Sequence, residues 1–255
     1  MTLKVLDLFS GIGGFSLGLE RTGGFRTVAF CEIEQDCHAT LRRGWPGVPI
    51  FNDVRELRGA DFHGVRWIVG GFPCQDASVA NIGGAGSAGG RTGLFREAIR
   101  LAGETGAGLF MENVPGLLNR GFGDVLRALA EIGHHVEWEC ISARAFGAEH
   151  KRERLWIVSY PRGEGWEGFE PHNGIFKRAQ AALAQHGHGA LGQWRALVAD
   201  QHLVRGGDGL SVGMERRRIH ALGNAVVPQI PEIIGRAILA AEGHASVPAS
   251  VIARQ

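Results

Sequence analysis

Two short apolar runs, each followed at once by glycines, constrain the fold of this chain more than any other feature. Residues 3–9 read LKVLDLF and precede SGIGG, and residues 65–69 read VRWIV and precede GGFPC. Short runs rich in β-branched and aromatic residues that end in glycine are typical of buried strands in a parallel sheet. Open α/β sheets place their binding sites where such strands end. The two runs therefore predict an α/β fold with a functional loop after each strand.

The remaining apolar segments alternate between strand and helix patterns. Further strands are expected over residues 25–31, 109–112 and 134–142 and from about residue 152. Helices are expected over residues 15–21, 92–103, 122–132 and 177–185, from the end of the second strand to about residue 43, and after Pro228. This alternation predicts a doubly wound, Rossmann-like α/β sheet.

Composition narrows the class of protein. A chain of 255 residues suits one large α/β domain or a domain with a small appendage. Its 40 glycines follow no fixed period and accompany ample apolar residues, which excludes collagen-like and disordered chains. The net charge of +1 gives no overall basic excess. Three of the 27 basic residues are lysines, leaving 24 arginines, which suit contacts to phosphate and guanine but also fit a GC-rich genome.

The cysteines and the amino terminus indicate a soluble intracellular protein. The four cysteines, at positions 31, 37, 74 and 140, lie apart without CxxC spacing, so neither a zinc site nor a disulfide framework is expected. The first residues do not resemble a signal peptide, and no stretch reaches the roughly 18 uncharged apolar residues of a membrane span. No membrane partner is expected.

The first glycine loop favours a nucleotide cofactor. Residues 10–14 form a turn between a strand and a helix, where backbone N–H groups can approach a ligand closely. Glu32 ends the second strand, where a carboxylate can accept hydrogen bonds from both ribose hydroxyls. Two alternatives remain open: the turn binds no ligand, and Glu32 and Glu34 only favour the start of the following helix.

The second glycine loop carries a candidate nucleophile. Cys74 follows Pro73, which restricts the backbone and presents the cysteine, although free cysteines are more often small core residues. Residues 112–115, Glu-Asn-Val-Pro, close the next strand. Arg152 and Arg154 alternate, so both point to one face of a new strand. For an isolated arginine pair, a solvated basic edge is the preferred interpretation.

The Pro-Cys-Gln motif around Cys74, after a glycine-rich first loop and before Glu-Asn-Val at residues 112–114, resembles the catalytic motif of the cytosine-5 DNA methyltransferases of compact bacterial or phage type. The resemblance spans residues 5–158 and 218–234. It implies a DNA (cytosine-5-)-methyltransferase that uses S-adenosyl-L-methionine to methylate C5 of a flipped-out cytosine in double-stranded DNA, through a covalent bond between Cys74 and C6. It also implies a cytoplasmic monomer in a bacterial cell or phage-infected host, with a cognate restriction endonuclease as a partner that the sequence leaves open.

The resemblance assigns roles to individual residues. Cys74 is the nucleophile, Glu112 holds or shares the proton that ring nitrogen N3 gains, and Asn113 orients the loop or the base. Arg152 or Arg154 would supply the positive potential that a thiol with a pKa of about 8.5 needs at neutral pH. The residues assigned to the cofactor are Phe9, Gly11, Ile12, Gly13, Gly14, Glu32, Ile33, Asp53, Val54, Gly71, Pro73, Leu94, Asn224 and Ala225. No metal ligand is expected.

The resemblance also divides the chain. It implies a catalytic domain (residues 1–160), a short target-recognition region (161–217), a return helix that completes the catalytic domain (218–243) and a tail (244–255). Four Trp and Phe residues follow residue 160 in the irregular region, namely Trp166, Phe169, Phe176 and Trp194. Aromatic residues in irregular loops suit groove contacts with DNA. An ordinary irregular subdomain is the alternative.

Three other functions remain open. Methylation of RNA would retain the same chemistry. A non-catalytic DNA-binding relative would have no use for Cys74 and Glu112. A nicotinamide-dependent oxidoreductase would explain the glycine turn and Glu32, but it would give Cys74, Glu112 and the arginine pair no shared function.

Overall fold

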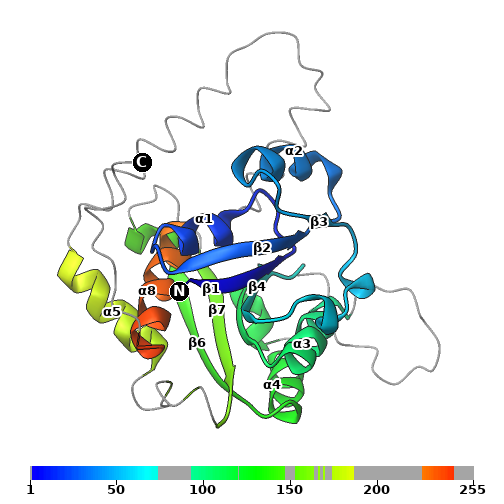
Figure 1. Cartoon of the computed structure of the whole chain (residues 1–255). Coiled ribbons are helices and arrows are strands. Elements are labelled where there is room, and N and C mark those ends of the chain that lie inside the picture. Colours follow the sequence, from blue (N-terminus) through cyan, green and yellow to red (C-terminus); the bar gives the residue numbers. More distant parts are fainter. Residues whose placement is uncertain are drawn as a thin grey trace.

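The structure is a computed structural model that describes residues 2–73, 93–119, 121–146, 153–163, 166, 169, 174–186 and 226–243. The described residues contain a seven-stranded sheet with the order β3-β2-β1-β4-β5-β7-β6 (Figure 1). The strands are β1 (Leu3–Leu8), β2 (Phe25–Cys31), β3 (Ile50–Phe51), β4 (Val65–Gly71), β5 (Gly108–Asn113), β6 (His134–Ser142) and β7 (Glu153–Pro161). The strands from β1 to β5 run parallel, whereas β7 pairs antiparallel with β5 and β6.

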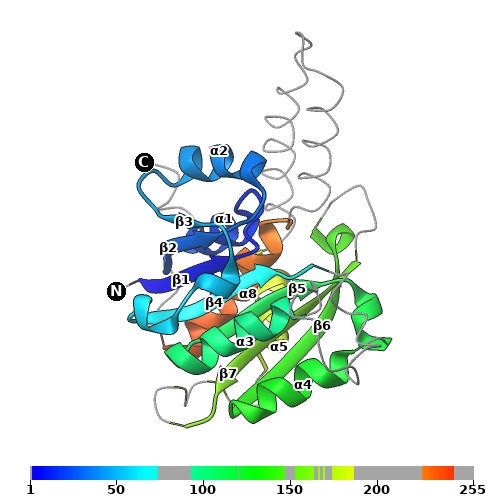
Figure 2. The same ribbon diagram turned by 90° about the vertical axis from the view of Figure 1, so that its right-hand side faces the viewer.

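Helices cover both faces of the sheet, which confirms the doubly wound α/β prediction. They are α1 (Gly14–Glu20), α2 (Gln35–Gly44), α3 (Leu94–Thr105), α4 (Phe122–Glu131), α5 (Ile175–His186) and α8 (Gln229–Ala241). The α3 and α4 helices lie on one face, and α5 and α8 on the other (Figure 2). Within the described part of the chain, no helix has the length and apolar character that crossing a bilayer requires.

The strand order reverses between β1 and β4. From β1 the chain builds outward through β2 to β3, then returns to add β4 and β5 on the other side. Open α/β sheets bind their ligands at the carboxyl ends of the strands beside such a reversal. The glycine turn follows β1, and the residues that lead to Cys74 follow β4, so the fold brings both predicted loops to this position.

Each face of the sheet packs on its own apolar core. Along β1, Val5 faces the core under α1 and α8, whereas Leu6 and Leu8 face the core under α3 and α4. Successive strand side chains point to opposite faces, so a strand covered on both faces must be apolar throughout. This is why the first run of the sequence shows little polar alternation.

Three of the four aromatic residues expected at the DNA are core residues instead: Trp166, Phe169 and Phe176, each 6% exposed. The ring centroids of Trp166 and Trp67 lie 5.3 Å apart, and those of Phe169 and Tyr160 lie 4.8 Å apart. Groove contacts are therefore not expected of these three. Irregular segments usually lie on the surface, but Trp166 and Phe169 pack on large apolar side chains of β4 and β7. The fourth residue, Trp194, lies outside the described residues.

The end of α8 is fastened to β4. Arg66 Nε donates to Glu242 Oε1 at 2.7 Å, and Trp67 Nε1 donates to the same oxygen at 3.3 Å. The Arg66 guanidinium also lies 3.4 Å from the centre of the Trp166 ring. These contacts hold the end of α8 against the sheet.

Candidate active site

The carboxyl ends of β1, β4 and β5 bring three predicted motifs to one edge of the sheet. The register pairs Leu8 of β1 with Gly70 of β4, and Gly71 of β4 with Glu112 of β5. Because neighbouring strands lie about 4.8 Å apart, the glycine turn, the strand that leads to Cys74 and the Glu-Asn-Val motif are neighbours.

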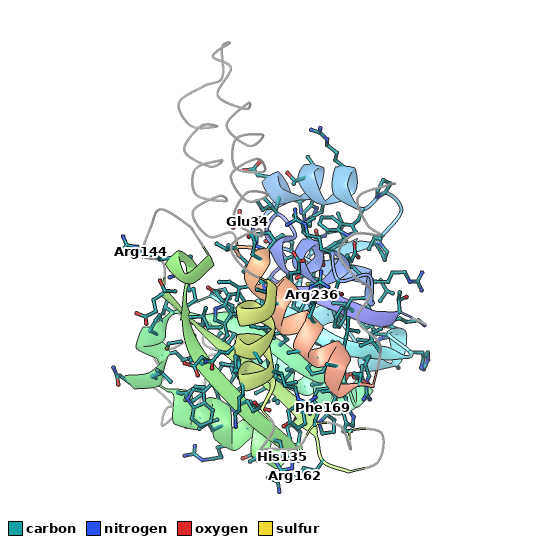
Figure 3. All side chains as sticks on the ribbon, turned by 90° about the vertical axis from the view of Figure 1, so that its left-hand side faces the viewer. Glu34, His135, Arg144, Arg162, Phe169 and Arg236 are labelled. Carbon is teal, nitrogen blue, oxygen red and sulfur yellow. The ribbon has the colours of Figure 1, made fainter. Side chains whose placement is uncertain are left out.

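The two edges of the sheet differ in what they carry. In Figure 3, Glu34 after β2 and Arg144 after β6 lie at the carboxyl edge, whereas His135 and Arg162 lie at the opposite edge. Every predicted site residue that the structure describes lies at or next to the carboxyl edge. The topology therefore assembles one candidate site.

The glycine turn adopts a constrained backbone. Phe9 (φ 53°), Gly11 (φ 53°) and Gly13 (φ 85°) are in the left-handed region, and Phe9 is the only described non-glycine residue with positive φ. Such a conformation costs a non-glycine residue about 1–3 kcal/mol and concentrates at ligand sites. Hydrogen bonds from Ser10 N to the Cys31 carbonyl (3.2 Å) and from Gly13 N to the Ser10 carbonyl (2.8 Å) hold the backbone there.

The glycines of this turn have different functions. A Cβ at Gly13 would lie 2.6 Å from the Trp45 ring, and a Cβ at Gly14 would lie 2.6 Å from the Val226 carbonyl oxygen. These two glycines are required by packing within the protein. A Cβ at Gly11, by contrast, would meet no described atom within 4 Å. Gly11 is thus the member of the turn whose open side can receive a ligand.

Glu32 closes the turn from β2. Its Oε2 accepts the Gly11 N–H at 2.6 Å and its Oε1 accepts the Glu34 N–H at 2.8 Å, while the residue is only 7% exposed. Each carboxylate oxygen keeps a further acceptor position, so Glu32 can still accept hydrogen bonds from ligand hydroxyls. The Glu34 contact shows that the same carboxylate also stabilises the start of α2.

Three further cofactor candidates near the ends of β2 and β3 differ in their exposure and contacts. Ile33 is 64% exposed and offers an apolar surface at the edge. Asp53 accepts a hydrogen bond from the Arg55 guanidinium at 2.6 Å, which lowers the pKa of Asp53. Val54 is 3% exposed and packs in the core under α3, so its side chain is part of the core next to the carboxyl edge.

The other cofactor candidates fall into two groups. Ile12 and Leu94 are half-buried and Pro73 is exposed, so all three retain accessible surface at the carboxyl edge. Asn224 and Ala225 lie outside the described residues. Their predicted contribution stays a prediction.

An ion pair between the adjacent strands β5 and β7 holds Glu112. Arg154 Nε of β7 donates to Glu112 Oε1 at 2.8 Å, with the two side chains 25% and 11% exposed. Arg154 therefore does not form an isolated basic edge, because its guanidinium fixes the predicted acid. Arg152 lies outside the described residues.

Asn113 fixes the backbone that leads to the candidate nucleophile. Its Nδ2 donates to the Phe72 carbonyl at 2.9 Å, and its Oδ1 accepts the Val114 N–H at 2.8 Å. Asn113 is 2% exposed. Phe72 precedes Cys74 by two residues, so this amide joins the ends of β4 and β5 just before the cysteine. Cys74 itself lies outside the described residues.

Asp7 is a buried acid that sequence reasoning missed. It is fully buried in β1, where its Oδ2 accepts from Ser16 Oγ at 2.6 Å and from Ser16 N at 3.3 Å. Burial, with a smaller contribution from the charge of Glu32, raises the pKa of Asp7 to about 8. Asp7 is the only acid of β1 and lies between the apolar residues Leu6 and Leu8, and this was the signal available in the sequence.

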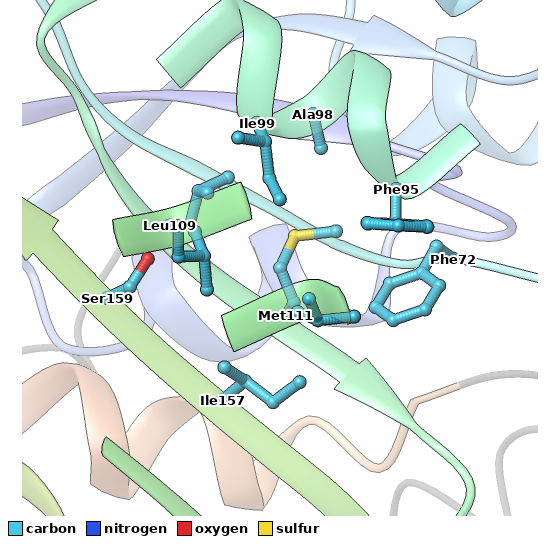
Figure 4. Close-up of a pocket in the computed structure, with 10 residues that line it drawn as sticks. Phe72, Phe95, Ala98, Ile99, Leu109, Met111, Ile157 and Ser159 are labelled. Carbon is cyan, nitrogen blue, oxygen red and sulfur yellow. The ribbon is translucent and has the colours of Figure 1, made fainter. Parts of the chain in front are cut away.

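A small cavity lies in the core rather than at the carboxyl edge. It has a volume of about 20 Å³, and its lining includes Phe72, Phe95, Met111 and Ile157 (Figure 4). Apart from Ser159, whose hydroxyl oxygen lies 3.2 Å from His134 Nδ1, this lining is apolar, and it contains no acid or base. The described residues also contain no group of three or more His, Cys, Asp or Glu side chains that could hold a metal ion.

Comparison with known proteins decides the family. Residues 3–193 match the family described as C-5 cytosine-specific DNA methylase. The chain belongs to this family. Among curated methylases, it is 35% identical over 166 residues to the type II methyltransferase M2.BsuMI of Bacillus subtilis, covering 62% of this chain and 42% of the relative. It is 33% identical over 208 residues to M.Sau3AI of Staphylococcus aureus, covering 69% and 50%. The chain thus spans about half the length of these curated relatives.

Solved structures agree with the methylase fold. A prophage-encoded DNA modification methyltransferase of E. coli has 27% identity and a TM-score of 0.53, over 63% of this chain and 47% of that one. Dnmt2 of S. pombe has 19% identity and a TM-score of 0.56, over 69% and 55%. At 19% identity, the similarity to Dnmt2 shows a shared fold alone.

Proposed function

We propose that this methylase transfers a methyl group from S-adenosyl-L-methionine to C5 of a flipped-out cytosine in double-stranded DNA, with Cys74 as nucleophile. One observation carries the proposal: Glu112, fixed by Arg154, lies beside the end of β4, and Asn113 holds the Phe72 carbonyl on the same strand end. An acid is thus positioned beside the segment that leads to the cysteine. The names of the curated relatives and of the prophage-encoded neighbour support the type of reaction.

The chemistry explains why these residues are needed together. Cytosine C5 is a poor nucleophile, and a thiolate that adds to C6 makes it enamine-like. In the proposed mechanism the Cys74 sulfur forms a bond to C6 while N3 gains a proton that Glu112 holds or shares. After methylation, a base removes the C5 proton, N3 returns its proton to Glu112 and the sulfur–C6 bond breaks, which restores the neutral aromatic ring and frees Cys74 as a thiolate. A duplex hides both faces of the ring, so the base must leave the stack.

The residues at the reversal of strand order fit the cofactor. Glu32 would accept from the ribose hydroxyls, Ile33 would pack on the adenine, and Gly11 would leave space at the turn. S-adenosyl-L-methionine, when bound, supplies an electrophilic methyl group. The other cofactor assignments, the domain boundaries, the monomeric state, the cytoplasmic location and a partner endonuclease all stay predictions.

Methyl transfer from radiolabelled S-adenosyl-L-methionine tests the proposal. Duplex DNA from a source without cytosine methylation and tRNA are compared as substrates. We expect label in DNA that is lost in Cys74→Ser, which should retain cofactor binding. Label in tRNA alone would favour the RNA alternative, and full activity of Cys74→Ser would refute the mechanism. Bisulfite sequencing of DNA from expressing cells would then identify the target site.

A duplex that contains 5-fluorocytosine tests the covalent step separately. Fluorine cannot leave C5 as a proton does, so the sulfur–C6 bond should persist and the protein–DNA complex should survive a denaturing gel. Cys74→Ser is the control. Absence of a stable complex with the native protein would contradict the covalent step.

A further inference from the structure

We propose that Asp7 is a positioning residue that holds the cofactor turn, residues 9–16, in its binding conformation. The identity of the cofactor in this inference rests on the proposed function. The contacts of Asp7 lie within the protein, and its effect on the cofactor would be exerted through the turn.

Asp7 caps α1 from a neighbouring strand. The N-cap residue of α1 is Gly13, which has no side chain to accept a hydrogen bond from the first helical N–H groups. The Asp7 carboxylate takes this place, because its Oδ2 accepts both the backbone N–H and the hydroxyl of Ser16 in the first turn of α1. The start of the helix is therefore bonded to β1.

The same residue also holds the beginning of the turn. Ser10 Oγ donates to the Asp7 carbonyl oxygen at 2.7 Å. Between Ser10 and Ser16 the chain passes through Gly11, whose N–H is bound by Glu32. Two buried carboxylates thus hold one strained turn: Glu32 binds its middle at Gly11, and Asp7 binds its end at Ser16, while the main-chain carbonyl of Asp7 accepts from Ser10 at its beginning.

The burial of Asp7 separates this role from a purely structural one. Asp7 is 0% exposed, and its Oδ1 has no hydrogen-bond partner in the described part of the chain. Burying a carboxyl oxygen that makes no hydrogen bond costs free energy of folding. An apolar residue of the same shape should therefore recover desolvation energy while losing the bonds to Ser16. Replacement by leucine should therefore disturb the turn more than the stability of the fold.

The test compares Asp7→Leu, Asp7→Asn and Ile238→Ala with the native chain. Asn keeps an acceptor for Ser16, and Ile238 is a buried α8 residue that lies in the core on the same face. The dissociation constant of S-adenosyl-L-methionine is measured by calorimetry at pH 7. We expect Asp7→Leu to weaken binding about tenfold, as loss of a cap and its turn suggests. Asp7→Asn should stay within about twofold of native, and Ile238→Ala should lower the unfolding temperature without changing affinity.

Hydrogen exchange without cofactor gives an independent readout. Amides of residues 9–17 should exchange faster in Asp7→Leu than in Asp7→Asn or the native chain. Native affinity and native exchange in Asp7→Leu would overturn the inference. If Asp7→Leu fails to fold, Ser16→Ala is the second variant, and unchanged affinity there would overturn it as well. A native protein that binds no S-adenosyl-L-methionine would instead contradict the proposed function.

Discussion

Gly71 and Glu112 face each other across β4 and β5 at a distance that leaves no room for a side chain. A Cβ at Gly71 would lie 2.8 Å from Glu112 Oε2. On its other side, Glu112 Oε1 receives the Arg154 guanidinium. The position of this carboxylate is therefore set by three strands at once, which gives the candidate acid a single defined position.

Gly71→Ala should displace the Glu112 carboxylate. Because misplacing a catalytic group by about 1 Å can cost on the order of 100-fold in rate, we expect methyl transfer to fall at least tenfold while the fold is retained. Single-turnover kinetics and circular dichroism measure the two effects. Gly123→Ala in α4 is the control, since a Cβ there meets no described atom within 4 Å. Equal rates in both variants would show that the Gly71–Glu112 contact does not matter.

Arg154→Gln should slow methyl transfer by removing the ion pair that positions Glu112. We expect a loss of about 10- to 100-fold, comparable to other general acid–base contributions, with Arg154→Lys intermediate because lysine cannot reproduce the guanidinium geometry. Arg127→Gln is the control, because it removes an ion pair of similar length, to Asp124 at 2.7 Å, on the surface of α4. This variant should keep the native rate. A native rate in Arg154→Gln would remove this ion pair from the mechanism.

Gly11→Ala should weaken cofactor binding with little loss of stability. Its methyl group would enter the open side of the turn, and the left-handed backbone would cost about 1 kcal/mol. Gly47→Ala is a matched control, because Gly47 also has positive φ (82°) and no described atom within 4 Å of a Cβ. Calorimetric titration should show weaker binding in Gly11→Ala only. Equal affinities in the two variants would place the cofactor elsewhere.

The titration of Asp7 should make stability depend on pH. Its pKa is raised to about 8 in the folded chain from 3.8, so between these values the folded state binds more protons than the unfolded state. The free energy of unfolding therefore falls as pH rises, by at most about 1.4 kcal/mol per pH unit. Urea unfolding from pH 5 to 9 should show Asp7→Asn gaining on the native chain up to about pH 8 and levelling off above it. Parallel stability curves would argue against a raised pKa.

Local patterns predicted the elements better than their contacts. The expected helix over residues 177–185 corresponds to α5 (Ile175–His186), and the expected strand over residues 134–142 matches β6. Hydrophobic periodicity and the positions of glycine and proline are local properties of the sequence, so they can be interpreted without knowledge of the fold. The burial of Trp166 could not be predicted from local sequence, because it depends on which strands lie beneath this residue in the folded chain.

The sequence by itself determined the glycine turn, the acid at the end of β2, the Glu-Asn-Val motif and the order of strands and helices. Each depends on neighbouring residues, whose side-chain size and backbone freedom act over one or two turns of chain. Only the tertiary structure decided that Arg154 pairs with Glu112 and that Asp7 bonds to Ser16. The Arg154–Glu112 contact joins strands more than 40 residues apart, and the Asp7–Ser16 contact forms only when α1 packs back on β1. Contacts of this kind follow from packing the whole sheet rather than from any stretch of sequence.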